Sequence, residues 1–201
     1  MNKGTTTIMP GMDELVRMAR DNRKAFLAVG RDTCLAAVRN HVTKQRACIR
    51  ARHEAGESGG TTLRLLTELC DATVRTVFDF ALTAAGNPVR LESQTALCAL
   101  GGYGRGEMSP CSDLDVSLIF DCPMDHDIEA LNTYLLPFFW DLGFKAGYTL
   151  HSVTDAVGLA ATDPTVFTTY AQSRLIYGDT TAFGRLKMTL ADMEPANYEA
   201  I

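Results

Sequence analysis

The amino-acid sequence predicts an α+β or α/β fold with a small sheet, and the order of its patterns supports this prediction. Up to residue 88 the chain carries only helix-like patterns. Short apolar runs that suit buried strands then flank a glycine-rich turn and one helical stretch, and helix-like patterns return at the C-terminal end. At 201 residues, 46% of them hydrophobic, the chain is long enough for one domain with a helical appendage.

The N-terminal part is predicted to be helical. Residues 12–55 carry apolar side chains at roughly helical intervals and indicate one broken helix or two. The glycine-rich residues 56–60 suit a loop, and a second helix is expected to begin at a cap, Thr61 or Thr62, and to end at "AGNP". We therefore predict an N-terminal helical region over residues 1–88 and a second domain over residues 89–201.

Three apolar runs indicate strands: residues 95–100 ("TALCAL"), 113–120 ("DLDVSLIF") and 146–153 ("AGYTLHSV"). Between the last two, residues 127–142 carry the apolar stripe of a helix. Trp140 lies in this helix beside two phenylalanines, and we expect it to be in the core.

The remainder of the chain is predicted to be helical. Thr154 suits the cap of a short helix, and Asp163 precedes a proline that fits a first helical turn. Thr180, which follows a glycine, suits the cap of a last helix.

Charge and cysteine usage restrict the functional class. The formal net charge of −5 argues against broad sequence-independent binding of nucleic acid, which needs excess Lys and Arg. The six cysteines form no C-x-x-C pair, so most are expected to be buried thiols of a reduced protein. The N-terminus has no apolar core of a signal peptide, and no run of about 18 apolar residues occurs. These features predict a cytoplasmic protein without a membrane partner.

The aspartates of "SDLDVSLIF" are the strongest candidates for catalysis. Side chains alternate between the two faces of a strand, so Asp113 and Asp115 should share one face while Leu114 and Val116 point into the core. Two neighbouring carboxylates repel each other unless a cation lies between them. Oxygen ligands of this kind suit Mg²⁺, which is commonly held by one or two carboxylates and substrate phosphates.

The glycines of "GGYGRGE" precede these aspartates and suggest a phosphate site. Gly101 and Gly102 follow a strand and can bring backbone N–H groups close to a phosphate. Arg105 can add a positive charge, or it can pair with Glu107. Ser112 is a candidate nucleotide ligand, with a structural role in the turn as the alternative. A nucleoside triphosphate beside a two-metal site points to nucleotidyl transfer.

Two other nucleotide motifs do not fit. A phosphate-binding loop of the G-x-x-x-x-G-K-[ST] type needs a lysine, and none follows these glycines. A dinucleotide fingerprint needs G-x-G-x-x-G, but Glu107 stands at the third glycine position. Hydride transfer is therefore not expected.

The stretch "GGYGRGEMSPCSDLDVSLIF" resembles the signature of the bacterial PII uridylyltransferase/uridylyl-removing enzymes, members of the DNA polymerase β-like nucleotidyltransferase superfamily. The segments "FFWDLGFKAGYTLHSVTD" and "DPTVFTTYAQSRLIYGD" are similar to those that follow in the same family, so the resemblance covers residues 95–186. It implies a small mixed sheet flanked by helices, and Mg²⁺-dependent transfer of UMP from UTP to a tyrosine of the PII nitrogen-regulatory protein. Gly101 and Gly102 would then hold the triphosphate, and Asp113 and Asp115 the metal.

Family members are several times longer and carry a metal-dependent HD hydrolase domain and ACT domains. The resemblance therefore indicates a fragment of a longer protein or a stand-alone relative. The chain also departs from the family: Gln172 stands where a glutamate is usual, and no third carboxylate can be assigned, since the third strand offers His151 and, just beyond it, Asp155.

Two alternatives to uridylylation remain, and the departures support the second of them. One is transfer of AMP to glutamine synthetase or to another protein, by enzymes with a similar glycine and Asp-x-Asp signature. The other is a regulatory nucleotide-binding module that has lost catalysis.

Overall fold

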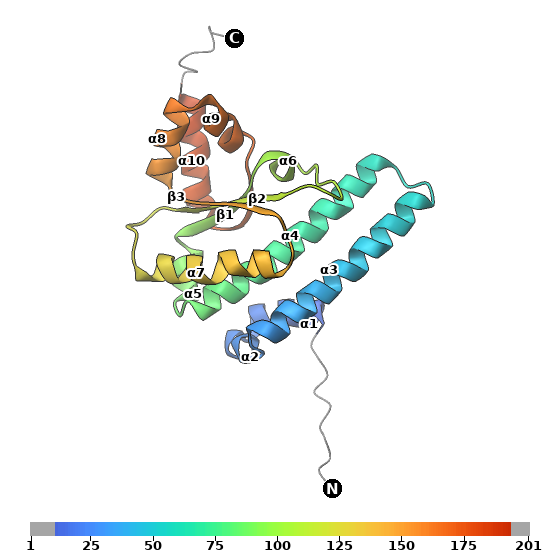
Figure 1. The fold of residues 1–201 in the computed structure, drawn as a ribbon. Coiled ribbons are helices and arrows are strands. Elements are labelled where there is room, and N and C mark those ends of the chain that lie inside the picture. The colour runs from blue at the N-terminus through green and yellow to red at the C-terminus, as the bar shows by residue number, and fades with distance from the viewer. Residues whose placement is uncertain (1–10, 194–201) are drawn as a thin grey trace.

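The computed structural model describes residues 11–193 and has helices on both sides of a four-stranded sheet (Figure 1). The helices and strands, in chain order, are α1 (Met12–Asp21), α2 (Arg23–Ala28), α3 (Arg31–Glu54), α4 (Gly59–Ala84), α5 (Pro88–Glu92), β1 (Thr95–Ala99), α6 (Gly101–Gly104), β2 (Leu114–Phe120), α7 (His126–Asp141), β3 (Ala146–Ser152), α8 (Val153–Thr162), α9 (Pro164–Ala171), β4 (Arg174–Gly178) and α10 (Thr180–Asp192).

The sheet is mixed, with the strand order β3-β2-β1-β4. β1 pairs antiparallel with both β2 and β4, whereas β2 and β3 run parallel. The small mixed sheet flanked by helices is therefore confirmed. In this order β1 and β3 lie on opposite sides of β2, which carries Asp115.

The N-terminal helical pattern is divided more finely than predicted. Residues 12–54 form three helices, α1, α2 and α3, separated near Asn22 and Gly30. α4 begins at Gly59 rather than at Thr61 or Thr62, because the hydroxyl of Ser58 accepts the N–H of Thr61 and acts as the cap. Its end at Ala84, before the left-handed Gly86, agrees with the prediction.

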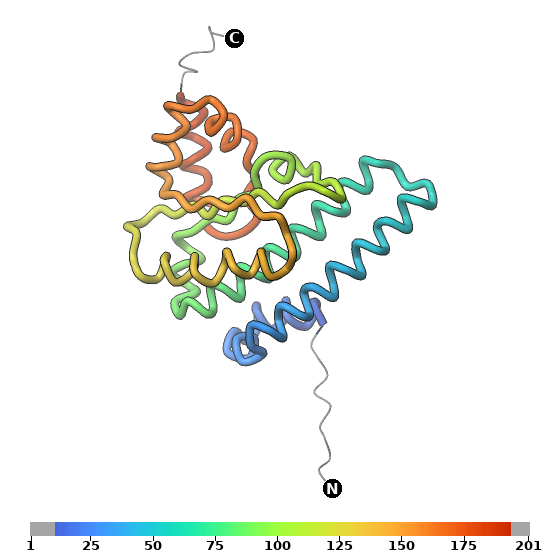
Figure 2. Tube along the Cα trace, viewed as in Figure 1, coloured from blue at the N-terminus to red at the C-terminus, as the bar shows by residue number. Residues whose placement is uncertain are grey.

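α3 and α4 form a long helical hairpin. They run side by side, and their connection at residues 55–58 projects beyond the sheet (Figure 2). The inner half of α4 is apolar and buried, whereas the second half of α3 exposes nearly every side chain except Ile49. The hairpin tip is thus held mainly by contacts between its own two helices.

One face of the sheet is covered by α4 and α7. Leu97 of β1 and Val116 and Leu118 of β2 point to this face and are fully buried. They join a single core cluster with the buried residues of α1 to α4 and of α7. The apolar surface of the N-terminal helices is therefore continuous with that of the sheet.

The other face is covered by α8, α9 and α10. Its smaller cluster contains Ala96 and Cys98 of β1 and Ile119 of β2. Each of these helices begins at a side-chain cap: Ser152 caps α8, Asp163 caps α9, as predicted, and Asp179 caps α10. The caps predicted at Thr154 and Thr180 are therefore wrong. Thr154 is the second residue of α8 and Thr180 the first residue of α10, and in each helix the residue before the first turn already accepts a free N–H.

The C-terminal part also contains a strand that the helical prediction missed. Residues 174–178 form the edge strand β4, which pairs with β1 around an irregularity between Leu97 and Cys98. Gly178 ends the strand with φ of 99°, and a Cβ there would lie 2.1 Å from the carbonyl oxygen of Thr95. Only glycine can bring the two backbones this close.

A partly buried carboxylate lies where α1 and α4 meet the β4 edge. Asp79 of α4 lies with Arg23, Arg75, Glu92 and Tyr177 around one pocket. Burial is the main cause that raises the pKa of Asp79 to about 6, and Glu92 adds repulsion, while Tyr177, Arg23 and Arg75 oppose it.

The raised pKa of Asp79 predicts a pH-dependent stability. Above pH 6 the folded protein carries an ionised Asp79 at a cost, so stability should rise as the pH falls from about 6 toward 4. We expect Asp79→Asn to raise the Tm at pH 8 by roughly 2–4 °C, equivalent to about 1 kcal/mol for this partly exposed group. Thermal unfolding at pH 8, 6 and 4 checks this, since the gain should shrink at each step. An equal gain at all three pH values would contradict it.

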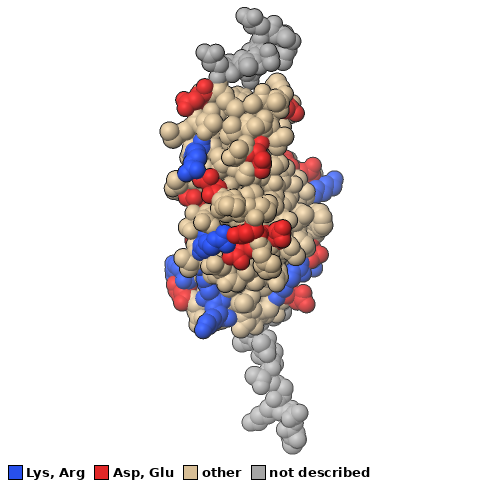
Figure 3. Space-filling model, turned by 90° about the vertical axis from the view of Figure 1, so that its left-hand side faces the viewer, with Lys and Arg blue, Asp and Glu red and all other residues tan. Residues whose placement is uncertain are grey.

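Surface charge is mixed. On the face in Figure 3, acidic and basic side chains are interspersed, and Lys and Arg are more frequent toward the lower end of the view. Of the cysteines, Cys34, Cys70 and Cys98 are buried, whereas Cys48 and Cys111 are exposed. Among residues 11–193, no helix has the length and apolar character needed to span a membrane.

Candidate active site

The glycine turn follows β1 directly and forms the one-turn helix α6. Gly101 has φ of 54°, in the left-handed region that favours glycine. Leu100 precedes it and donates its N–H to the carbonyl oxygen of Asp115 at 2.9 Å. The first N–H groups of a helix have no carbonyl partner within that helix, so the backbone of Gly101 and Gly102 can donate to an anion beside Asp115.

Asp115 is the second residue of β2 and Asp113 lies directly before the strand, and both side chains line the same depression, as alternation predicts. Asp113 is exposed and Asp115 is half-buried. Leu114, which separates them, and Val116, which follows Asp115, are both fully buried. Burial raises the pKa of Asp115, and the negative charge of Asp113 raises it further. The pair therefore carries a repulsion that a bound cation would relieve.

The carboxylate of Asp115 lies between two glycines from different elements. A Cβ at Gly101 would lie 3.3 Å from its Oδ2, and a Cβ at Gly147 would lie 2.3 Å from its Oδ1. Gly147 is the direct partner of Asp115 in the parallel register of β2 and β3. The glycine turn, β2 and β3 thus converge on one carboxylate, and side chains are absent on both sides of it.

This arrangement fits a hard divalent cation. Asp113 and Asp115 offer carboxylate oxygens, and the described residues contain no group of three His, Cys, Asp or Glu side chains that could complete a protein cage. Mg²⁺ is commonly bound by one or two carboxylates together with waters and phosphate oxygens. The two aspartates would hold such an ion, and its remaining ligands would come from substrate and water.

The two candidates for a third ligand are engaged elsewhere. The ring Nδ1 of His151 lies 2.8 Å from the hydroxyl of Tyr170, which in turn lies 3.3 Å from the hydroxyl of Ser117. Asp155 accepts the hydroxyl of Ser152 at 2.7 Å, at the start of α8. The β3 residue opposite Ser117 is Thr149, which completes the hydroxyl network. These hydrogen bonds tie α9 to the sheet.

Arg105 extends over the glycine turn. Its Nε donates to Glu107 at 2.8 Å, and its NH1 donates to the side-chain oxygen of Gln172 at 2.9 Å. Its NH2 would lie 3.8 Å from a Cβ at Gly102. Arg105 therefore pairs with Glu107 in this structure, yet its guanidinium stays beside the turn, where a phosphate could meet it.

Ser112 takes part in the loop between the glycine turn and β2. Its hydroxyl accepts the N–H of Ser109 at 3.0 Å and lies 2.8 Å from the hydroxyl of Ser109. The loop hydrogen bonds hold Ser112 directly before Asp113. A role as a nucleotide ligand stays a prediction.

A partly buried ion pair fixes the glycine turn to α4 and β4. Tyr103 is 1% exposed, and its hydroxyl donates to Asp71 of α4 at 2.8 Å. Arg174 of β4 donates two hydrogen bonds to the same carboxylate, at 2.8 and 3.0 Å, and its guanidinium also lies over the Tyr103 ring. Tyr103 is thus a packing residue, and Asp71 and Arg174 are supporting residues that the sequence analysis did not identify.

An open depression of about 410 Å³ lies on the β3 side of the aspartates. Trp140, Phe144 and Lys145 line it together with Asp113 and Asp115. Trp140 is 58% exposed, so its predicted place in the core is wrong. The helical stripe of α7 explains this: side chains three or four residues apart share a face, and Trp140 falls outside the stripe of Leu135, Phe138, Phe139 and Leu142.

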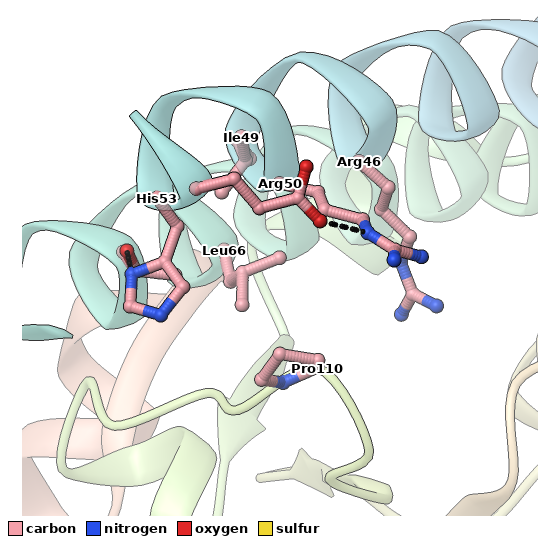
Figure 4. A pocket seen from close by; sticks show the side chains of 8 residues that line it. Arg46, Ile49, Arg50, His53, Leu66 and Pro110 are labelled. Carbon is pink, nitrogen blue, oxygen red and sulfur yellow. Dashed lines mark hydrogen bonds and ion pairs between the residues drawn. The ribbon is translucent and has the colours of Figure 1, made fainter. Parts of the chain in front are cut away.

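A second pocket, of about 350 Å³, lies between the α3–α4 hairpin and the loop after the glycine turn (Figure 4). Arg46, Ile49 and His53 come from α3, Leu66 comes from α4 and Pro110 from the loop. The guanidinium of Arg46 also lies 5.6 Å from the centre of the Phe144 ring. Arg46 therefore connects this pocket to the depression beside the aspartates.

Comparison with protein-family models identifies the family of this chain. Residues 43–147 match the family described as putative nucleotidyltransferase DUF294. The chain belongs to this family. The matched DUF294 segment runs from α3 through the glycine turn, both aspartates and Gly147.

Curated relatives are similar to this chain over most of its length. The chain is 34% identical over 160 residues to the bifunctional uridylyltransferase/uridylyl-removing enzyme of Azospirillum brasilense, covering 78% of this chain and 17% of that protein. It is 32% identical over 180 residues to the enzyme of the same name from Rhodospirillum rubrum, covering 88% and 19%. The DUF294 chain thus spans less than a fifth of the length of these relatives.

Proposed function

We propose that this DUF294 chain transfers UMP from UTP to a tyrosine of the PII signal protein, with release of pyrophosphate and dependence on Mg²⁺. One observation carries the proposal: the Asp115 carboxylate lies between the glycine turn and Gly147, with Asp113 beside it. Glycines on both sides leave the carboxylate accessible to a triphosphate and a metal. The names of the relatives supply the choice of UMP, and PII is the acceptor that the family resemblance implies.

The reaction is a displacement at the α-phosphorus of UTP. The phenolic oxygen of the acceptor forms a bond to this phosphorus, the bond to the oxygen shared with the β-phosphorus breaks, and pyrophosphate leaves with that oxygen. The phenolic proton passes to solvent. Mg²⁺, when bound, neutralises charge on the phosphates and lowers the barrier to attack.

The residues of the chain bind the triphosphate and the cation and orient them for the reaction. The N–H groups of Gly101 and Gly102 donate to the triphosphate, and Arg105 can turn from Glu107 toward it. Asp113 and Asp115 hold the cation. The Asp71 bridge between Tyr103 and Arg174 keeps the turn in place, which matters because small misplacements of reacting groups cost large factors in rate.

A second candidate function is a module that binds nucleotide without transferring it. Gln172 stands where members of the resembled family usually carry a glutamate. Its neutral amide oxygen accepts a hydrogen bond from Arg105. His151 pairs with Ile119, four positions along β2 from Asp115, and Asp155 lies beyond β3 in the first turn of α8, so neither residue supplies a third carboxylate beside Asp115. These features favour weaker catalysis and leave nucleotide binding intact.

Intact-mass spectrometry of the acceptor tests the proposal. PII and glutamine synthetase are each incubated with the chain, Mg²⁺ and one of the four nucleoside triphosphates. We expect a UMP-sized gain on PII with UTP alone. In the isosteric variant Asp113→Asn/Asp115→Asn the rate should fall at least about 1,000-fold, which corresponds to roughly 4 kcal/mol of barrier.

The control is Asp32→Asn, which removes a fully exposed carboxylate on α3 and should leave transfer unchanged. An AMP-sized gain on glutamine synthetase would establish the adenylyltransferase alternative instead. Mg²⁺-dependent nucleotide binding without any mass gain would establish the binding module.

A further inference from the structure

The depression beside the aspartates lies opposite the glycine turn. In phosphoryl-type displacements the attacking and leaving oxygens lie roughly in line, on opposite sides of the phosphorus. If the glycine turn holds the triphosphate, the pyrophosphate leaves on the β1 side of Asp115. The acceptor must then approach from the β3 side, because β1 and β3 flank β2 on opposite sides.

The surface on that β3 side has the composition of a binding site. Trp140 is 58% exposed, and Phe144 lies beside it in the lining of the depression. Exposed aromatic side chains supply a large share of the binding energy at protein interfaces. β3 is an edge strand, so its start is not covered by another strand.

The positive charges of this surface are available to a partner. Lys145 is exposed, and neither it nor Arg46 forms a salt bridge with another of the described residues. Arg46 instead lies against the ring of Phe144. A bound metal would offset the two aspartates, leaving these cations to attract an acidic side chain.

We propose that Trp140, Phe144 and Lys145 form the acceptor-binding surface, and that its occupant is a loop of the acceptor protein carrying the reactive tyrosine and an acidic neighbour. The tyrosine ring packs against Trp140, with its hydroxyl directed to the aspartates, and the acidic neighbour meets Lys145 and Arg46. This inference rests on the proposed function and adds to it the side from which the protein substrate enters.

Steady-state transfer of UMP to PII tests the surface, with the KM for PII and the affinity for UTP in the presence of Mg²⁺ measured separately. We expect Trp140→Ala to raise the KM for PII about 30-fold, and Lys145→Glu about 10-fold, with UTP affinity unchanged. Trp140→Phe should recover most of the loss, because it keeps an aromatic face. The matched control is Tyr134→Ala, which removes an exposed aromatic ring from the same helix outside the depression.

The possible outcomes separate the two proposals. Normal KM values for PII in all variants of a chain that does transfer UMP would overturn the acceptor surface and leave the proposed function standing. A loss of UTP affinity in Trp140→Ala, with the KM for PII unchanged, would show that Trp140 binds the nucleotide. That result would also overturn the acceptor surface. A wild-type chain that binds no UTP would overturn the proposed function, and the acceptor surface with it.

Discussion

Gly147→Ala is expected to lower the rate of nucleotidyl transfer roughly 100-fold while leaving the protein folded. The new Cβ would lie 2.3 Å from Oδ1 of Asp115, which is too short for a non-bonded contact between carbon and oxygen. The atom it meets is the end of a side chain, so the carboxylate can rotate away and the backbone can stay. A misplacement of about 1 Å in a reaction's geometry is enough for a 100-fold loss, and this is the loss expected if Asp115 holds the metal as proposed.

A transfer assay and a thermal melt, run on the same preparation, check this. Gly158→Ala is the matched control, since no atom lies within 4 Å of its new Cβ. It lies inside α8 and should stabilise the protein by up to about 1 kcal/mol without changing the rate. Full activity in Gly147→Ala would show that the position of Asp115 does not limit the reaction.

A chain consisting of residues 89–201 is expected not to fold. The division predicted at residue 88 separates α4 from the sheet, yet α4 covers that sheet with a buried apolar face. Each buried Leu, Val or Phe contributes about 1.5–3 kcal/mol, so losing several of them exceeds the ~5–15 kcal/mol by which a domain is usually stable. The lost residues include Leu66, Leu69, Val74, Val77, Phe78, Phe80 and Leu82.

Circular dichroism and denaturant unfolding show whether each shortened chain is folded. We expect residues 89–201 alone to aggregate or to unfold without a cooperative transition. A chain beginning at residue 11 retains every described helix and should unfold as the full chain does. A cooperative transition from residues 89–201 alone would establish that part as an independent domain.

The sequence predicted the features that depend on local pattern. Alternation placed Asp113 and Asp115 on one face, and the apolar runs of β1, β2 and β3 located three strands to within two residues. The glycine turn and its neighbouring aspartates were predicted because a short motif determines them. The division between α1, α2 and α3 was not resolved, because one helical period runs through all three.

The missed features depend on contacts between distant residues. β4 has only five residues, and its strand geometry comes from pairing with β1, about 80 positions earlier. A run this short fits a helix or a strand equally well. The Asp71–Arg174 pair joins residues 103 positions apart, which no local motif encodes.

The bridge between Tyr103, Asp71 and Arg174 also has a mechanical consequence. It fastens the glycine turn to α4 at a point 12 residues from Gly59, which is about 18 Å along a helix. The glycine turn and the α3–α4 hairpin are therefore joined through the single carboxylate of Asp71, so the position of the turn depends on a helix that is distant from it in the sequence.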